Sequence, residues 1–189
     1  MRKCKVCGDK FEAKYNTIQP TCSVPCAIIY GKKVRDKSYK AASKAFKKVV
    51  RDNDRSWHIK TCQTAFNRYI RLRDRDEPCI SCQRYHQGQY HAGHFKSIGS
   101  AGELRFIEAN CHKQCSVCNN HKSGNVGEYK INLIKKIGAD AVEWLEGPHK
   151  AKKYTIEELK ELTALYRQAI KGIEKDAQGL IQSIREHKS

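Results

Sequence analysis

Eight of the ten cysteines form two sets of four, and the second set encloses residues that could carry out metal-ion chemistry. Its cysteines are Cys79, Cys82, Cys115 and Cys118. Histidines and asparagines lie between these cysteines or just after them: His91, His94, Asn110, His112, Asn119 and His121. Four thiolates complete the coordination of a zinc ion, so we expect this zinc to be structural. A catalytic ion would then have to use the histidines and asparagines that the zinc site holds together.

His94 and Asn119 have the side chains that phosphodiester hydrolysis needs. A neutral imidazole at His94, near the end of a predicted strand, could take a proton from water, and Gly93 leaves room for a substrate backbone. Asn119 follows the last thiolate and would begin a helix, where it could bind a divalent ion that neutralises phosphate charge. Mg²⁺ keeps several waters and needs few protein ligands, whereas several nitrogen ligands would suit Mn²⁺ or Zn²⁺ better.

The first cysteine set lies near the N-terminus and predicts a second structural zinc ion. Its ligands would be Cys4, Cys7, Cys22 and Cys26, arranged as two pairs with fourteen residues between them. Such a zinc finger stabilises a segment that is too short to fold alone. The finger either contacts DNA or serves as a structural cap. No signal-peptide-like apolar region follows the N-terminus, so we expect a reducing cytoplasm, where paired cysteines bind metal instead of forming disulfides.

The elements that must position these residues indicate an α+β protein that is mostly helical. Its four predicted parts are the zinc finger, a basic helical segment, the cysteine–histidine module and a long C-terminal helix: residues 1–27, 28–77, 78–147 and 148–189. Within the module, two short strands are predicted at residues 89–95 and 104–107. The C-terminal helix begins at a capping box in which Thr155 and Glu158 satisfy each other's backbone amides.

Apolar residues follow heptad spacing along the C-terminal helix and shift by one position near its end: Leu159, Leu162, Tyr166, Ala169 and Ile173, then Ala177, Leu180 and Ile184. This stripe would either dock onto the protein's own body or pair two copies of the chain as a homodimer. Two active sites that cut opposing strands would require the homodimer.

The net charge of +17, from 37 Lys and Arg against 20 Asp and Glu, indicates a polyanionic partner. Nucleic acid is favoured over an anionic membrane surface. No run of about 18 apolar residues is present, which excludes a membrane span. The stretch from Lys32 to Arg75 contains fifteen Lys and Arg residues but only four Asp residues. This excess of positive charge favours a surface that binds phosphates along nucleic acid over a helix face that is only solvated. The residues expected to contact DNA are Lys44, Lys47, Lys48, Arg51, Arg68, Arg71 and Lys122.

The second cysteine set resembles the ββα-metal, or HNH, nucleases. The shared pattern is a CxxC pair, a histidine that ends a strand, an asparagine before the second CxxC pair, and the run Cys118-Asn119-Asn120-His121-Lys122. The zinc-stapled type of phage endonuclease VII, a Holliday-junction resolvase, is the most similar. More narrowly, most of residues 66–145 is similar to the NinG (Rap) recombination proteins of lambdoid phages. Five stretches carry that likeness: 70–74, 79–82, 92–95, 104–106 and 114–119.

This resemblance implies a zinc-stapled ββα-metal module flanked by basic helices, with two structural zinc ions and one catalytic Mg²⁺ or Mn²⁺. It implies a structure-specific DNA endonuclease that acts on branched recombination intermediates such as D-loops and Holliday junctions. Such an enzyme would work in the cytoplasm of a bacterial host, with branched double-stranded DNA and recombination proteins as its partners.

Matched by position, His94 corresponds to the family's general base and Asn119 to its helix-borne metal ligand. Asn110 corresponds to the middle asparagine, which braces the histidine. The related resolvases carry an aspartate directly before the base, where this chain has Gly93. His91 is the nearest substitute ligand, with the histidines at 112 and 121 as the other candidates. Residues three apart in a straight strand point to opposite faces, so His91 and His94 could share an ion only across a bulge or a strand end.

Other functions are compatible with the same residues. A non-catalytic zinc-finger protein could bind nucleic acid and keep only an HNH-shaped scaffold. An adaptor could recruit recombination proteins through the C-terminal helix. A site-specific HNH endonuclease would cut linear duplex as readily as branched DNA.

Overall fold

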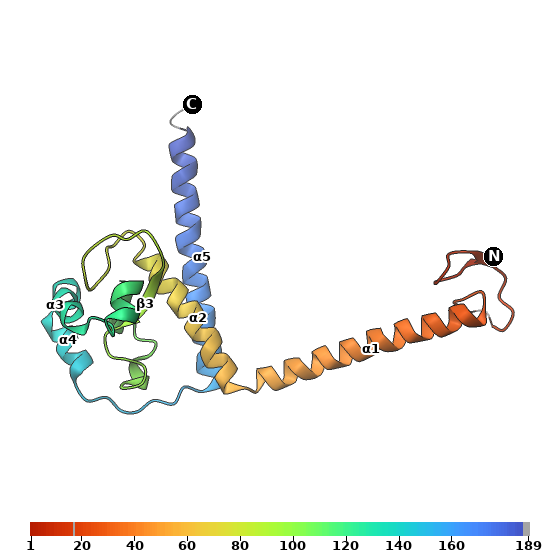
Figure 1. The fold of residues 1–189 in the computed structure, drawn as a ribbon, viewed down its shortest axis with the longest axis horizontal. Helices are drawn as coiled ribbons and strands as arrows, with labels where there is room; N and C mark the ends of the chain where they lie inside the picture. Colours follow the sequence, from red (N-terminus) through yellow and green to blue (C-terminus); the bar gives the residue numbers. More distant parts are fainter. Residues whose placement is uncertain (17, 187–189) are drawn as a thin grey trace. The chain divides into compact units, whose positions relative to one another are not determined.

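The computed structural model describes residues 1–16 and 18–186, and the side chains up to residue 179. The chain divides into two compact units, residues 1–53 and 54–189 (Figure 1). Both are helical with one small two-stranded sheet each, which confirms a mostly helical α+β protein. Among the described residues, no helix combines the length and the apolar character needed to cross a membrane.

The first unit joins a small hairpin to one long helix. Strands β1 (Arg2–Lys3) and β2 (Lys10–Phe11) pair antiparallel, and α1 (Val24–Asp52) follows. Ser23 caps α1 by accepting a hydrogen bond from the Cys26 backbone amide. Within residues 1–16 and 18–53, only Cys4 and Thr21 are buried, so the unit lacks an apolar core of its own. Its fold must therefore depend on the cysteines.

The second unit is built around two packed helices, α2 (Arg55–Arg73) and α5 (Ile156–Glu186). Phe66 of α2 and Tyr166 of α5 meet edge to face, with 5.1 Å between ring centroids, within an apolar core that also contains Leu159. The predicted capping box is confirmed. The Thr155 backbone amide donates to the Glu158 carboxylate at 2.8 Å, and the Glu158 backbone amide donates to the Thr155 hydroxyl at 3.1 Å.

Because Leu159 and Tyr166 are buried against α2, the heptad stripe over residues 159–170 docks onto the protein's own body. That part of the stripe is not available to pair two copies of the chain, so the structure does not support the predicted homodimer contact there. Leu180 and Ile184 lie outside the residues whose side chains are described.

Between α2 and the later helices of the second unit, the chain forms a β-hairpin. Strands β3 (Tyr90–His94) and β4 (Cys111–Cys115) pair antiparallel, with Tyr90 opposite Cys115 and His94 opposite Cys111. The predicted second strand at 104–107 is wrong. That segment begins with the last residue of the 3₁₀ turn η1 (Gly102–Leu104) and continues as a loop to η2 (Glu108–Asn110). Leu104 and Phe106 alternate like strand residues, but both are buried as anchors of a loop.

After β4, the chain forms a short π-helical turn, η3 (Val117–His121), and two helices, α3 (Val126–Ile137) and α4 (Ala139–Glu146). The order in this region is therefore strand, strand, helix. α3 and α4 share an apolar core that includes Tyr129, Leu133 and Leu145. Of these, Tyr129 bonds to the hairpin, since its hydroxyl donates to the Gly93 carbonyl at 2.9 Å.

Candidate active site and metal centres

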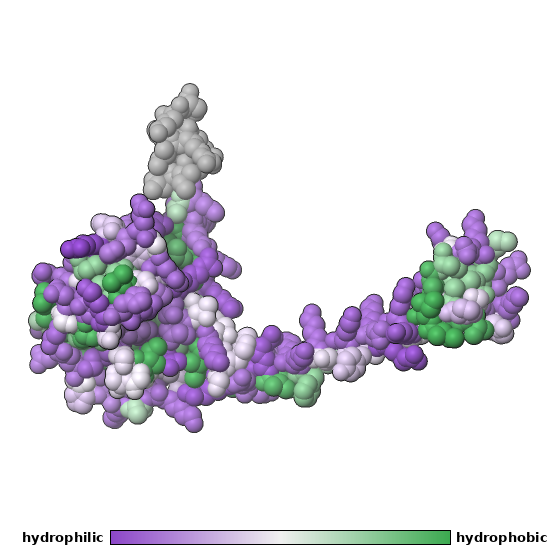
Figure 2. All heavy atoms as spheres, in the orientation of Figure 1, coloured by the Kyte–Doolittle hydropathy of each residue, from purple (hydrophilic) through white to green (hydrophobic). Residues whose placement is uncertain are grey.

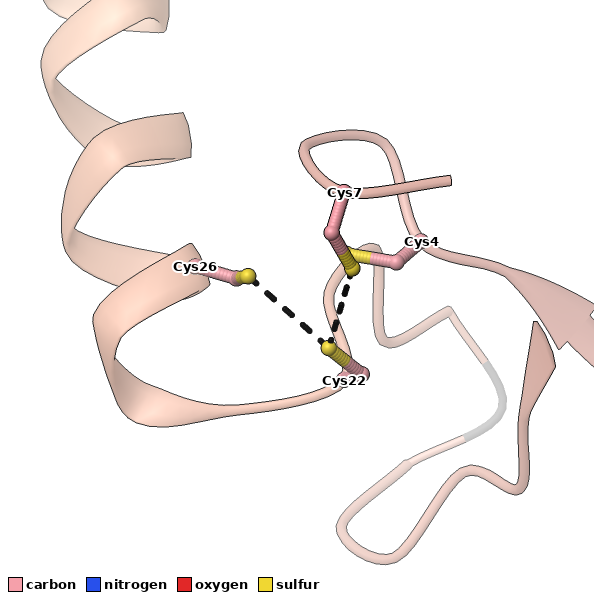
Figure 3. A group of neighbouring side chains, drawn as sticks. All are labelled: Cys4, Cys7, Cys22 and Cys26. Atoms are coloured by element: carbon pink, nitrogen blue, oxygen red, sulfur yellow. Dashed lines mark hydrogen bonds between the residues drawn. The ribbon is translucent and has the colours of Figure 1, made fainter. Parts of the chain in front are cut away.

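The first thiolate cluster has the geometry of a tetrahedral metal site (Figure 3). The sulfur atoms of Cys4, Cys7, Cys22 and Cys26 all lie within 4.8 Å of one another. Cys7 and Cys22 are 3.5 Å apart, and Cys22 and Cys26 are 3.8 Å apart. A Zn–S bond of about 2.3 Å places two sulfurs of a tetrahedron about 3.8 Å apart, far beyond a disulfide bond. These spacings fit zinc and exclude a disulfide.

The second cluster, Cys79, Cys82, Cys115 and Cys118, has the same compactness, with all four sulfurs within 4.8 Å. The Cys115 backbone amide donates to the Cys79 sulfur at 3.3 Å. Burial alone would raise the pKa of Cys79, but this bond and neighbouring backbone bonds outweigh it and lower the pKa. A thiolate is therefore favoured, as metal binding requires. An ion here would tie residues 79–82 to the start of η3 and so hold the hairpin closed.

Both clusters offer four thiolates and no open coordination position, which suits structural zinc. Within residues 1–16 and 18–179, no other group of three or more His, Cys, Asp or Glu side chains converges in this way. The two predicted structural sites are thus confirmed as groups that could hold metal. A catalytic ion would need amide ligands as well as histidine.

His94, the last residue of β3, is partly buried with its ring orientation fixed. Its Nε2 lies 2.9 Å from the Arg105 carbonyl oxygen. A carbonyl can only accept, so Nε2 carries the proton and Nδ1 is the basic nitrogen of the neutral ring. Burial lowers the pKa of His94, opposed by the bond to the Arg105 carbonyl and assisted by the Arg105 charge. The imidazole is therefore neutral near pH 7, as a general base must be.

The thiol of Cys111 faces the other nitrogen of His94. Its sulfur lies 3.8 Å from Nδ1. Burial raises the pKa of Cys111, so the thiol stays protonated and can donate a weak hydrogen bond to Nδ1. A water molecule that His94 activates would have to take the place of this weak donor.

Asn110 is fully buried and braces the loop that follows His94. Its Oδ1 accepts from the Lys96 backbone amide at 2.8 Å. Its Nδ2 donates to the carbonyls of Lys96 at 3.0 Å and Leu104 at 3.2 Å. The Phe95 amide also donates to the Asn110 carbonyl at 2.8 Å. Asn110 thus fixes the backbone on both sides of the loop that carries the Arg105 carbonyl.

The register of the hairpin separates the two histidines of β3. It is continuous from residue 90 to 94, with no bulge at Gly93, so His91 and His94 point to opposite faces. His94 shares its face with Cys111, whereas His91 shares its face with Gln114. His91 and His94 therefore do not bind one ion together in this structure.

Asparagines of η3 lie on the His91 face. Asn120 Nδ2 is 3.4 Å from His91 Nε2, and Asn119 Nδ2 donates to Asn120 Oδ1 at 2.6 Å. Asn120, rather than Asn119, thus contacts His91 directly. Of the other candidate ligands, His121 is exposed, while His112 is buried with its Nδ1 3.2 Å from the Tyr129 hydroxyl.

Comparison with known proteins now places this chain. The family model of the bacteriophage lambda NinG protein matches residues 1–176. The chain belongs to the NinG family. It is 38% identical to protein ninG of Escherichia phage 933W over 187 residues, which cover 91% of this chain and 93% of that relative. It is 49% identical to protein ninG of Escherichia phage lambda over 119 residues, 63% of this chain and 58% of the relative. No solved structure matches the chain.

In this NinG-family chain, the basic residues predicted to contact DNA lie on both units. Lys44, Lys47, Lys48 and Arg51 have spacings of three and four, which place them on one exposed face of α1. Figure 2 shows that the surface of α1 is mostly hydrophilic.

The remaining three predicted DNA contacts belong to the second unit. Arg68 instead binds Glu174 of α5 at 2.5 Å, so it also holds α2 to α5. Arg71 is partly buried on α2, and Lys122 is exposed directly after η3. Contact of these residues with DNA stays a prediction.

Sequence reasoning missed three residues that shape the site of this NinG-family protein: Gln114, Asn120 and Tyr129. Gln114 and Tyr129 act through contacts across the hairpin, which depend on its register. Asn120 directly follows the predicted ligand Asn119, and only the geometry of η3 distinguishes the two. No local sequence signal marks these contacts.

Proposed function

We propose that this NinG-family protein is a metal-dependent endonuclease that cuts branched DNA formed during recombination, in the cytoplasm of an infected bacterium. The observation that carries the proposal is the bond between His94 Nε2 and the Arg105 carbonyl. It leaves a neutral imidazole with a basic Nδ1 at the end of a hairpin that Asn110 braces and four thiolates could clamp. The order of strand, strand and helix after Cys82 agrees with a ββα-metal module.

In the proposed reaction, His94 Nδ1 takes a proton from the attacking water. The Arg105 carbonyl holds the ring in place and stabilises the imidazolium that forms, because it accepts from the opposite nitrogen. Asn110 keeps that carbonyl at a fixed distance by holding the loop on both sides. The basic side chains of Arg105 and Lys122 are candidates to hold the phosphate.

The His91 face fits a divalent ion in the chemistry of its donors. His91 offers an imidazole nitrogen, and the side-chain amide of Asn120 lies beside it with Nδ2 toward His91 and Oδ1 accepting from Asn119. To bind an ion, the two asparagines would turn their amide oxygens toward it. Such a mixed set suits Mn²⁺ at least as well as Mg²⁺. A bound ion would neutralise charge on the phosphate and stabilise the leaving oxygen.

Recognition of branched DNA is proposed to rest on shape. The basic face of α1, defined above by four residues, presents positive charge along one line and no buried residue. Such a surface contacts phosphates and responds to backbone position and bendability, not to base identity. A preference for junctions over linear duplex follows.

The test is cleavage by the purified, zinc-loaded protein of a four-way junction, a D-loop and a linear duplex of matched length and salt. Each is incubated with Mg²⁺, with Mn²⁺ or with EDTA. We expect cation-dependent cutting of the branched substrates. Equal cutting of the linear duplex would point to a plain HNH endonuclease.

A second candidate function is non-catalytic binding of branched nucleic acid. The regular register favours it, because His91 and His94 lie on opposite faces and a protonated thiol faces His94 Nδ1. Binding of all three substrates without cleavage under any of these conditions would establish this function in place of the nuclease.

A further inference from the structure

Gln114 fills the space that a side chain at position 93 would need. A Cβ atom added to Gly93 would lie 2.1 Å from Gln114 Oε1 and 3.0 Å from its Cβ and Cδ. No residue larger than glycine fits at 93 while Gln114 keeps its position. Gly93 directly precedes His94, so the Gln114 amide lies beside the residue that precedes the proposed base.

The Gln114 amide has a fixed orientation that leaves its oxygen without a partner. Nε2 donates to Ser81 Oγ at 2.7 Å and to the Gly124 carbonyl at 2.5 Å. If the amide were flipped, Gln114 Oε1 would face the Gly124 carbonyl oxygen, and neither atom can donate a hydrogen bond. Nε2 must therefore point toward Gly124. Gln114 is 1% exposed, and Oε1 is buried with no hydrogen-bond partner among the described residues. A buried acceptor without a partner is rare and calls for a cation or a water molecule.

No Asp, Glu, Lys or Arg side chain lies on this face of the hairpin, which consists of His91, Gly93, His112 and Gln114. His91 pairs across the strands with Gln114, and Asn120 contacts His91. Two carboxylates of the second unit are engaged elsewhere. Glu108 accepts from Tyr69 at 2.9 Å, and the Asp74 carboxylate binds Arg73 and the Lys113 amide.

We propose that Gln114 Oε1 is an oxygen ligand of the catalytic ion and that the ion binds only together with a DNA phosphate. This inference rests on the proposed nuclease function. Neutral ligands in a chain of net charge +17 offer a divalent ion no compensating negative charge. A DNA phosphate bound on the same face of the hairpin as Gln114 would supply that charge, so ion and DNA bind cooperatively.

The test measures Mn²⁺ binding by electron paramagnetic resonance, which reports the loss of the free-ion signal. Zinc-loaded protein with His94→Ala, which keeps the junction intact, is titrated with and without a four-way junction, and the Mn²⁺ bound by DNA alone is subtracted. We expect Mn²⁺ to bind roughly 100-fold more tightly when DNA is present, since one phosphate charge lies within a few ångströms of the ion. Equal affinity with and without DNA would overturn the cooperative part of the proposal.

Two variants test Gln114 itself. Gln114→Ala should abolish the DNA-dependent Mn²⁺ binding and leave junction binding in the absence of Mn²⁺ intact. Asn132→Ala is the matched control, because Asn132 is also a buried amide with two carbonyl partners, Ser81 and Glu128, but it lies outside the site. Normal Mn²⁺ binding by Gln114→Ala would show that Oε1 holds only a water molecule, and would overturn the proposal.

A gain-of-function variant tests the charge argument separately. In the double variant Gly93→Asp with Gln114→Ala, a carboxylate enters the vacated space, and Mn²⁺ should bind without DNA. If Mn²⁺ still requires DNA in this variant, the charge argument is wrong. These measurements do not depend on cleavage. The ion-binding proposal can therefore fail while the nuclease function holds, and the nuclease function can fail while the ion-binding proposal holds.

Discussion

Acidification from pH 7.5 to 5.0 should destabilise the second unit through His112. The side chain is 3% exposed, and burial, helped by the Arg73 charge, lowers its pKa to about 3. In the unfolded chain the pKa is near 6.5. Between these values the unfolded state binds a proton that the folded state refuses, so stability falls as pH falls from 6.5 toward 3. At pH 5.0 the two pKa values predict a loss of about 2 kcal/mol.

The assay is urea unfolding of wild type and His112→Phe at pH 7.5 and 5.0 with saturating zinc. Phenylalanine removes the titrating group and keeps most of the volume. It also removes the bond to Tyr129, but it does so at both pH values. Protonation of zinc thiolates affects both proteins alike, so the difference between the two pH-dependent losses isolates His112. His121→Phe, at an exposed position, is the control and should behave as wild type.

An equal loss of stability in wild type and His112→Phe would refute this reasoning. It would mean that His112 is protonated in the folded state, and hence that the Tyr129 side of the hairpin is open to water. The buried contacts from Tyr129 to Gly93 and His112 would then need revision.

Three further predictions concern the fold. Chelation of zinc should unfold the first unit, whose described residues form no apolar core, and the loss of α1 should appear as a fall in helical circular dichroism. Asn110→Ala should cost about 2–4 kcal/mol in urea unfolding, because the buried Lys96 amide loses its acceptor and two carbonyls lose their donor. Tyr166→Ala should cost about 3–5 kcal/mol and leave sedimentation unchanged, since this side chain packs within one chain. An altered oligomeric state would instead support pairing through α5.

The sequence predicted features that depend on local spacing. The capping box at Thr155 depends on residues three positions apart. Each thiolate cluster consists of two cysteine pairs that are local in sequence and that a single ion would join. The predicted position of the second strand was wrong, because a strand and a loop with two buried side chains can both bury Leu104 and Phe106 alternately. The heptad stripe could not reveal its partner, because α2 of the same chain offers the same apolar contact as a second copy.

Within the site, the sequence identified the residue types but not their faces. His94 bonds to the Arg105 carbonyl and Asn110 braces the loop between Lys96 and Asn110, while the role of His94 as a base stays a prediction. The role of Gln114 depends on its place opposite His91, from which its side chain reaches diagonally to Gly93; a shift of one residue in register would turn it to the other face of the hairpin. Such cross-strand placement is a property of the folded hairpin alone.

The most direct test of the nuclease mechanism is single-turnover cleavage of a labelled four-way junction by wild type and His94→Ala, with Mn²⁺ and saturating zinc. Junction binding is measured for both proteins under the same salt. We expect His94→Ala to bind the junction as wild type does and to cleave it roughly 100-fold more slowly or worse, because a general base usually contributes at least that factor. Equal cleavage rates for the two proteins would contradict the assignment of His94 as the base and the mechanism built on it.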